Sequence, residues 1–370
     1  MSSENWAVSP LPFLPGQELC QQYYKQAVLP ILQRGFPGLP HTAALVGYGS
    51  DVLGYDTPLS RDHMWGPRLV LFLPEDASES LRAQLLAALR RELPTQFYGY
   101  PTHFSDPDGE GVRIPTPIES GPVDPLIALT SLSAFTQQEL GITPQQALTP
   151  ADWLTFAEQR LLGVTAGRVY HDDLGLEALR SRLAYYPDPV WRYLLACQWM
   201  RLSQEEPFVG RTHSAGDELG SRLITARLCQ DVMRLAFLLE RRYAPYSKWF
   251  GTAFQRLDLA AQLSPCLQGA LEANDFPQRE AQLCSAYETL ARAHNALGLT
   301  PTLDASCSLF HQRPFRVLHA ERFAAALQET LRDPWLRALP LYGGLNQYCT
   351  TTDILESPAA WRRLQGLYGG

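Results

Sequence analysis

The chain has 370 residues, of which 45% are hydrophobic and 19% charged, and its formal net charge at pH 7 is −7. That length exceeds one ordinary hydrophobic core and indicates two domains. Phosphate backbones require clustered positive charge, so the acidic balance argues against a nucleic-acid partner. A membrane-spanning helix needs about 20 consecutive apolar residues, and no apolar run in the sequence is that long. This argues against a membrane partner.

The cysteines and the start of the chain bear on the cellular compartment. Seven cysteines are scattered without a CxxC spacing, which favours buried, reduced thiols over a disulfide framework or a zinc site. The first residues, MSSENWAVSPLPFLPG, show no basic leader before an apolar stretch, so we expect no signal peptide. Together these features predict a cytoplasmic protein.

The first part of the chain mixes helices with strands. Residues 17–34 have helical apolar spacing that Pro30 interrupts, which predicts a helix kinked or broken at that proline. Ser78 has the residue type of a helix cap, and the proline-rich residues 101–125 are expected to form a long loop. Strands are predicted at 42–46, 68–73, 95–100 and 126–130, and helices at 78–93 and 133–140.

After about residue 148 the pattern becomes helical. Thr149 offers a cap with Pro150 at the first helical position. Helices are predicted at about 150–162, 174–184, 188–205, 216–243, 246–262, 277–298 and 317–331. The sequence therefore predicts an α+β fold, in which a small mixed sheet with helices (residues 1–147) is followed by an all-helical domain (residues 148–370).

Polar chemistry is concentrated between the first two predicted strands, in Val46–Leu73. The first apolar run ends in Gly47-Tyr48-Gly49-Ser50, and the second begins at Arg68. Small residues let backbone N–H groups approach an anion, and carboxylates one loop later can hold a divalent cation against it. The polar loop between the two runs carries Asp51, Asp56, Asp62 and His63. This arrangement predicts a phosphate site with Mg²⁺.

Three motifs carry a resemblance to a known family. GSDVLGYD, SRDHMWGPR and, much later, RRYAPYSKWFGTAF resemble a bacterial family of nucleotidyltransferase-like proteins whose domain has no assigned function. More broadly, Gly-Ser after a strand, followed by an acidic turn into the next strand, resembles the DNA polymerase β-type nucleotidyltransferase superfamily. The resemblance implies a nucleotidyltransferase-type mixed sheet, a nucleoside triphosphate as substrate and Mg²⁺ as cofactor.

The resemblance also implies roles for individual residues. Gly49 and Ser50 would hold the triphosphate, and Asp62 would bind metal and serve catalysis. Independently of the resemblance, the charge and position of Arg68 predict a contact with phosphate or substrate. Lys248, from the PYSKWF motif of the helical domain, would reach the triphosphate and stabilise the leaving pyrophosphate.

The sequence departs from the superfamily pattern at two metal positions. Met64 falls where the second aspartate is expected, and Ala128 falls where the third carboxylate is expected. A thioether is a poor ligand for a hard cation that prefers oxygen. The candidate substitutes are Asp51, Asp56, Glu119, Asp124 and His63.

Each candidate also has a structural explanation. Gly49-Ser50 can be an ordinary turn, Asp62 can bond local backbone amides, and Arg68 can pair with Asp51 or Asp56. Lys248 can be an exposed lysine at a helix start. Trp65 is expected to be a core aromatic rather than a base-stacking platform.

Further candidates lie after the first predicted domain. Glu205 and Glu206 can bind a cationic acceptor or deprotonate its hydroxyl, or else cap a helix or pair with Arg201. His171-Asp172-Asp173 is expected to be a helix-entry turn capped by Asp173, with a metal role as the alternative. Arginines of the 216–243 helix can clamp phosphates or form a solvated face.

Two functions follow from these observations. The leading hypothesis is a nucleotidyltransferase-like enzyme that transfers a nucleotidyl group to a small-molecule or protein acceptor. The alternative is a catalytically degenerate protein that binds a nucleotide or a partner, which Met64 and Ala128 favour. An RNA-directed transferase is a third hypothesis, against which the acidic charge counts. Convergence of two carboxylates on one point would favour the enzyme.

Overall fold

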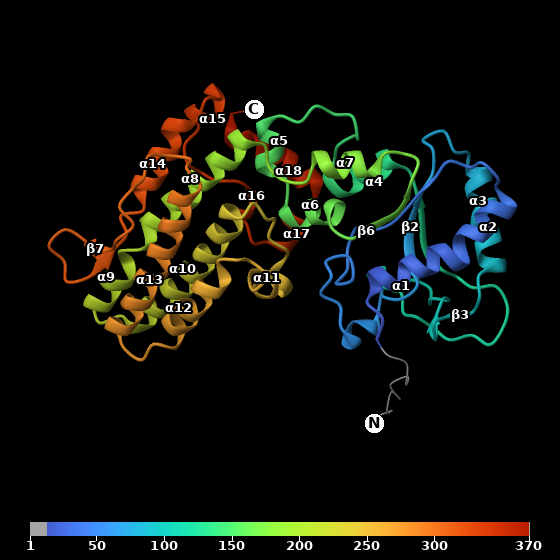
Figure 1. The fold of residues 1–370 in the computed structure, drawn as a ribbon, viewed down its shortest axis with the longest axis horizontal. Coiled ribbons are helices and arrows are strands. Elements are labelled where there is room, and N and C mark those ends of the chain that lie inside the picture. Colours follow the sequence, from blue (N-terminus) through green and yellow to red (C-terminus); the bar gives the residue numbers. More distant parts are fainter. Residues whose placement is uncertain (1–12, 370) are drawn as a thin grey trace. The chain divides into compact units, whose positions relative to one another are not determined.

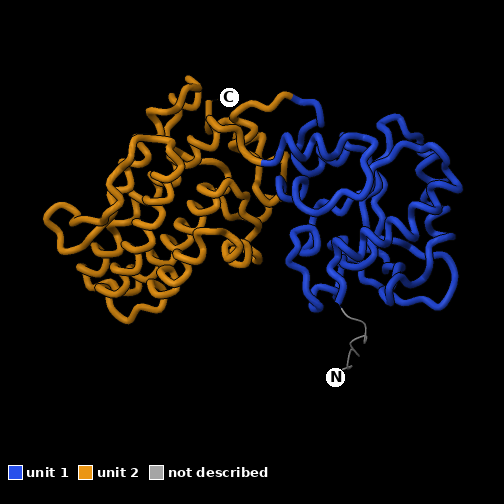
Figure 2. Tube along the Cα trace, in the orientation of Figure 1, with its two compact units in different colours: residues 1–146, 160–184 blue, residues 147–159, 185–370 orange. Residues whose placement is uncertain are grey.

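The computed structural model describes residues 13–369 and divides into two compact units. The first unit comprises the residues up to Gln146 together with 160–184, and the second comprises 147–159 and the residues from Tyr185 onward (Figure 2). The linear division expected at 147/148 placed 160–184 in the second domain. These residues instead belong to the first unit, because they carry a strand that completes its sheet.

A four-stranded mixed sheet forms the centre of the first unit. Its order is β5-β2-β1-β6, with β1 antiparallel to both neighbours and β2 parallel to β5. The strands are β1 (Thr42–Leu45), β2 (Arg68–Phe72), β5 (Leu126–Thr130) and β6 (Arg168–Asp172). The predicted strands at 42–46, 68–73 and 126–130 are thereby confirmed, whereas β6 was not predicted.

Helices pack on this sheet, as the α+β prediction requires. Pro30 lies in the first turn of α2, directly after a π-helical turn at Tyr24–Val28, so the helix is irregular next to this proline but is not broken there. Ser78 caps α3 by accepting the Leu81 N–H. The helices are α1 (Gly16–Tyr23), α2 (Leu29–Gly35), α3 (Glu79–Glu92), α4 (Leu132–Leu140) and α7 (Leu176–Arg182). Helix α6 (Glu158–Thr165) begins in the second unit and continues in the first.

One core cluster joins α1, α2 and α3 to strands β1 and β2. Leu19, Leu71 and Leu89 are fully buried members of it. Apolar burial of this kind supplies about 25 cal/mol per Å² and fixes the sheet against its helices. The loop that follows β1 is therefore attached to a rigid base.

The predicted strand at 95–100 is instead a tight hairpin. Strands β3 (Gln96–Phe97) and β4 (Tyr100–Pro101) pair antiparallel. The two residues between them, Tyr98 and Gly99, have φ of 50° and 78°. Positive φ at both central residues is the requirement of a two-residue hairpin turn, so the chain reverses there rather than continuing.

The second unit is helical apart from one short hairpin, β7 (Ser308–Leu309) with β8 (Arg316–Val317). Figure 1 shows α10, α12 and α13 side by side, and α8 packs against α10 and α14. Trp199 of α8 stacks on Phe323 of α14 with ring centroids 4.5 Å apart. No helix in the described part of the chain is long and apolar enough to cross a membrane.

The predicted helices at about 188–205, 216–243, 277–298 and 317–331 are present in this unit, whereas the helices at 208–214 and after residue 333 were not predicted. The helices of the unit are α5 (Pro150–Thr155), α8 (Asp188–Glu205), α9 (Phe208–Ser214), α10 (Glu218–Leu239), α11 (Ser247–Phe254), α12 (Ala260–Glu272), α13 (Phe276–Ala296), α14 (Glu321–Thr330), α15 (Pro334–Ala338), α16 (Leu345–Tyr348), α17 (Thr352–Leu355) and α18 (Pro358–Leu364). Thr149 caps α5 with a capping box to Asp152, which confirms the predicted start.

Candidate functional site

The loop after β1 has the backbone that its glycines predict. Gly47 and Gly49 have φ of 93° and 126°, a region in which side chains are strained. The Gly47 N–H donates to the Gly163 carbonyl at 2.7 Å. The Tyr55 N–H donates to the Ser50 carbonyl at 2.8 Å and closes the turn. The resulting loop is short and held at both ends.

A buried ion pair braces this loop. Arg68 donates through Nε to Asp51 Oδ2 and through a terminal nitrogen to Oδ1, each at 2.8 Å. The same nitrogen donates to the Tyr48 carbonyl at 2.7 Å. A Cβ on Gly49 would lie 2.3 Å from Asp51 Oδ1 and 2.5 Å from Arg68, so a side chain does not fit there.

Electrostatics keep this pair charged. Burial disfavours the guanidinium ion, but the adjacent Asp51 carboxylate outweighs that effect and raises the pKa of Arg68. Of the partners expected for Arg68, the structure shows Asp51. The arginine therefore positions the Gly47–Ser50 loop from inside the first unit.

Two further candidate carboxylates have internal partners. Asp56 Oδ2 accepts the Gly16 N–H at 2.7 Å and the Trp65 Nε1–H at 2.9 Å. Asp124 forms ion pairs with Arg90 and Arg113 at 2.6 and 2.5 Å. Trp65 is buried, which confirms that it is a core aromatic.

Asp62 is the accessible carboxylate of the loop. It ends a 3₁₀ turn (Pro58–Asp62), and 66% of its side chain is exposed. His63 Nδ1 lies 2.9 Å from Asp62 Oδ2. Both side chains can therefore meet a ligand from solvent.

The two departures from the superfamily pattern have structural environments of their own. Met64 has a φ of 50°, and its sulfur accepts the Arg113 N–H at 3.1 Å. Ala128 is an exposed residue of β5, opposite Val70 in the parallel register. Neither position brings an oxygen ligand toward Asp62.

The candidate carboxylates of the first unit do not form a group of three with closely spaced ligand atoms. Within residues 13–369, three side chains have ligand atoms close enough to share a metal ion, all within 4.8 Å of one another. They are His41, His171 and Asp173. This group includes none of Asp51, Asp56, Asp62, Glu119 and Asp124.

Lys248 lies in the second unit, as the second residue of α11. It is exposed, and its Nζ lies 5.1 Å from the centre of the Trp249 ring. This is the environment of an exposed lysine at a helix start.

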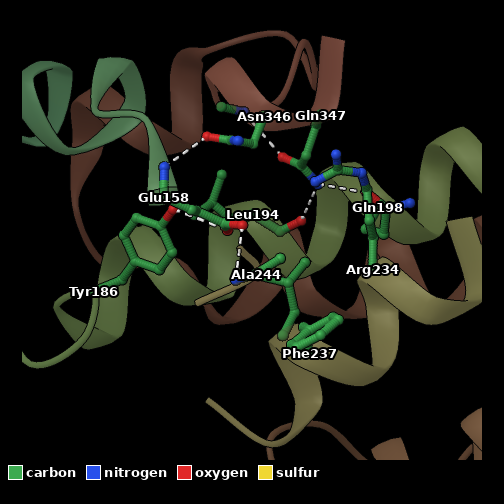
Figure 3. Close-up of a pocket in the computed structure, with 11 residues that line it drawn as sticks. Glu158, Tyr186, Leu194, Gln198, Arg234, Phe237, Ala244, Asn346 and Gln347 are labelled. Atoms are coloured by element: carbon green, nitrogen blue, oxygen red, sulfur yellow. Dashed lines mark hydrogen bonds between the residues drawn. The ribbon is translucent and has the colours of Figure 1, made fainter. Parts of the chain in front are cut away.

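The second unit contains a small pocket that sequence reasoning missed (Figure 3). Glu158 is buried in it, and its carboxylate accepts the Tyr186 hydroxyl at 3.2 Å and the Ala244 N–H at 3.1 Å. Burial raises the pKa of Glu158, and Arg234 acts in the opposite direction. Asn346 Oδ1 accepts the Glu158 N–H at 2.9 Å.

Amide side chains complete this pocket. Gln347 donates to Gln198 Oε1 at 2.9 Å, and Arg234 lies beside them with its guanidinium 5.4 Å from the centre of the Phe250 ring. The residues that line the pocket include members of α6, α8, α10 and α16. Because these helices are far apart in the sequence, no local motif predicts the pocket. A carboxyl group, a guanidinium and amides are suited to a small polar ligand.

The other acidic candidates have structural roles. Glu205 pairs with Arg227, and Glu206 accepts the backbone N–H groups of Leu318 and Ala320 at 2.7 and 2.9 Å. The expected partner of these glutamates, Arg201, pairs instead with Asp231 at 2.7 Å.

The turn before α7 is capped by a different aspartate from the one predicted. Asp172 accepts the N–H groups of Gly175, Leu176 and Glu177. Asp173 does not cap the helix. Its carboxylate accepts the backbone N–H of His41 and pairs with His171.

The fold and loop define a two-unit α+β protein with a glycine-containing loop after its first strand. Residues 153–250 match a family described as a domain of unknown function (DUF4037). The chain is also similar to a nucleotidyltransferase-like protein from Exiguobacterium sibiricum, with 12% identity and a TM-score of 0.33, over 85% of this chain and 91% of that chain. No curated protein matches the chain.

Proposed function

We propose that this chain is a nucleotidyltransferase-like protein that binds a nucleoside triphosphate at the Gly47–Ser50 loop. The observation that supports this most is the loop itself, which has left-handed glycines directly after β1 and a buried Arg68–Asp51 brace. Its backbone N–H groups and the Ser50 hydroxyl are the phosphate ligands of the proposal. The nucleotidyl group passes to a small-molecule or protein acceptor.

The residues fit one Mg²⁺ that is shared with the triphosphate. Mg²⁺ is commonly held by one or two carboxylates together with substrate phosphates, and Asp62 is the exposed carboxylate at this loop. The residues do not fit a metal pair held by protein carboxylates, because Met64 and Ala128 supply no oxygen. When bound, Mg²⁺ neutralises charge on the phosphate oxygens.

The proposal gives separate tasks to the remaining residues. Arg68 acts as a positioning residue through Asp51. Lys248 is proposed to neutralise the leaving pyrophosphate, which a Lys248→Ala variant tests as slower transfer with unchanged folding. All seven cysteines are free thiols, which suits a reducing compartment, and we propose that the protein is cytoplasmic.

Isothermal titration with ATP, GTP, CTP and UTP, each with and without Mg²⁺, tests the binding step. We expect Mg²⁺-dependent binding of at least one nucleotide, weakened about 10- to 100-fold in Asp62→Asn, because one charged contact is lost. Asp106→Asn, an exposed aspartate of the same unit, is the matched control and should bind normally. Failure of all four nucleotides to bind would refute the proposal.

A second candidate is a protein that binds the nucleotide without transferring it. Asp51, Asp56 and Asp124 are all engaged by internal partners, and this observation favours it. Nucleotide labelled at the α-phosphate separates the two functions. Pyrophosphate release with a labelled acceptor supports transfer, whereas tight binding with neither product, across an acceptor screen, supports the second candidate.

A further inference from the structure

Two histidines and an aspartate meet at the other end of β1 from the Gly47–Ser50 loop. His41 directly precedes β1, whereas His171 and Asp173 lie at the end of the edge strand β6. The antiparallel register pairs Ala43 with His171, and His41 is two residues from Ala43, so the imidazoles share a face. Their ring centroids are 4.4 Å apart.

The ligand atoms of this cluster are close and oriented. One atom from each of the three side chains lies within 4.8 Å of the others. Asp173 Oδ2 is 2.8 Å from His171 Nε2 and accepts the backbone N–H of His41 at 3.2 Å. The cluster is also accessible, because 37% of the His171 side chain and 42% of the Asp173 side chain are exposed.

His41 has the hydrogen bonding of a metal-ligating histidine. Its Nδ1 lies 3.0 Å from the Leu39 carbonyl, which only accepts, so Nδ1 carries the proton. The lone pair is therefore on Nε2, which accepts the Tyr24 hydroxyl at 2.8 Å, so a metal ion would take the place of that hydroxyl proton. A carbonyl on the far nitrogen is the usual device that orients a ligating imidazole.

We propose that His41, His171 and Asp173 bind a divalent first-row transition metal, with Zn²⁺ as the occupant. Two imidazoles and one carboxylate are a zinc donor set with an open position, and imidazole is a poor ligand for Mg²⁺. Bond lengths of about 2.0–2.1 Å place tetrahedral ligand atoms about 3.4 Å apart. The exposed side chains of His171 and Asp173 would have to rotate to reach this spacing, and their exposure leaves them room to do so.

The site would fasten the edge of the sheet. His41 belongs to the chain entering β1, and His171 and Asp173 belong to the 160–184 segment that returns to the first unit. Metal binding would therefore link β1 to β6 and stabilise their pairing by mass action. This inference is independent of nucleotide binding, because it uses none of the residues of the Gly47–Asp62 loop.

The test uses the full chain freed of metal by a chelator. Titration with Zn²⁺ should show one site in the wild type, weakened more than about 100-fold in His171→Ala and in Asp173→Asn, since even second-shell changes cost about 10- to 100-fold. Zn²⁺ should raise the melting temperature of the wild type but not of these variants. His213→Gln is the control, because exposed His213 lies 3.6 Å from Glu218 without a third donor.

Cobalt identifies the ligands independently. Bound Co²⁺ should give the visible absorption of a tetrahedral nitrogen and oxygen site, which both cluster variants lose. Zn²⁺ binding that is equal in the wild type and the variants would overturn the proposal, as would an intense near-ultraviolet thiolate band, which indicates a cysteine site. Far-ultraviolet circular dichroism checks folding, and the conservative Asp173→Asn variant keeps the test decisive if His171→Ala unfolds.

Discussion

At the residue scale, the Arg68–Asp51 pair is the contact on which the Gly47–Ser50 loop most depends. The side chains are 6% and 1% exposed, so neither charge can be solvated if its partner is removed. The pair also contacts the loop directly through the Tyr48 carbonyl. A change in either residue should therefore affect stability and the loop together.

We predict that Asp51→Asn lowers the free energy of unfolding by about 3–5 kcal/mol, because it leaves the Arg68 guanidinium buried without a counter-charge. Urea denaturation measures the change. Glu177→Gln, which removes an exposed i,i+3 partner of Arg180, is the control and should cost less than about 0.5 kcal/mol. Equal losses in the two variants would contradict the prediction.

Glu206 should make stability depend on pH. Burial raises its pKa from 4.5 to about 7, although the N–H groups of Ala320 and Leu318 oppose this. Between these values the native protein holds a proton that the unfolded chain releases. Stability therefore falls as the pH rises through this range, by about 3 kcal/mol at most, and levels off above about 7.

The measurement is urea denaturation of the wild type and of Glu206→Gln from pH 4.5 to 8. The variant stays neutral and should lack this component of the slope, whereas Glu205→Gln, in which an exposed pair with Arg227 is lost, should keep it. Parallel pH profiles for Glu206→Gln and the wild type would show that burial of Glu206 does not set the slope.

At the element scale, the pairing of β6 with β1 depends on a close approach of backbones at Gly167. Its φ is 75°, and a Cβ there would lie 2.0 Å from the Leu45 carbonyl oxygen. Gly175, at the other end of β6, has a φ of 89° with nothing within 4 Å of an added Cβ. The two glycines thus share the left-handed backbone but not the steric restriction.

We predict that Gly175→Ala costs about 1–2 kcal/mol, from the left-handed backbone alone. Gly167→Ala should cost clearly more, because the β1 backbone must move as well. Thermal unfolding compares the stabilities, and amide exchange at Ala43, whose N–H is on the β6 side of β1, reports the loss of β1–β6 pairing. Similar losses in both variants would show that the contact with Leu45 is not limiting.

Elements defined by local chemistry were predictable, and those defined by distant partners were not. Helix α8 has the bounds predicted from its apolar spacing, 188–205, and the caps Ser78 and Thr149 were read from residue type. The predicted helix at 246–262 is instead two helices. Glu240, the residue that caps the C-terminus of α10, accepts the N–H groups of Asp258 and Leu259 and so helps to set the start of α12.

At the scale of the whole molecule, the first unit is discontinuous in sequence. Its edge strand β6 follows a segment, 147–159, that belongs to the second unit. Without β6, strand β1 would have an unpaired edge beside the buried residues Leu45 and Val52. The stable folding unit therefore extends beyond the boundary that composition suggests.

We predict that a fragment of residues 1–184 unfolds cooperatively and stays monomeric, whereas a fragment of residues 1–147 aggregates or unfolds at a markedly lower temperature. The physical reason is the open edge of β1. Circular dichroism melting and gel filtration of the two fragments provide the measurements. The prediction fails if the shorter fragment is as stable as the longer one.

Local patterns in the sequence determined the α+β class, most helices, three of the four sheet strands and the glycine loop after β1. They determined these features because the spacing of apolar residues, the capping of helices and the preferences of turns act over a few residues. Tertiary structure alone decided that Arg68 pairs with Asp51, that Glu158 lines a pocket, and that His41 meets His171 and Asp173. Arg68 and Asp51 lie within one segment, and the fold decided only which of two aspartates Arg68 meets. The pocket and the histidine cluster join elements that lie far apart in the chain, and their spacing is set by packing that no short window of sequence contains.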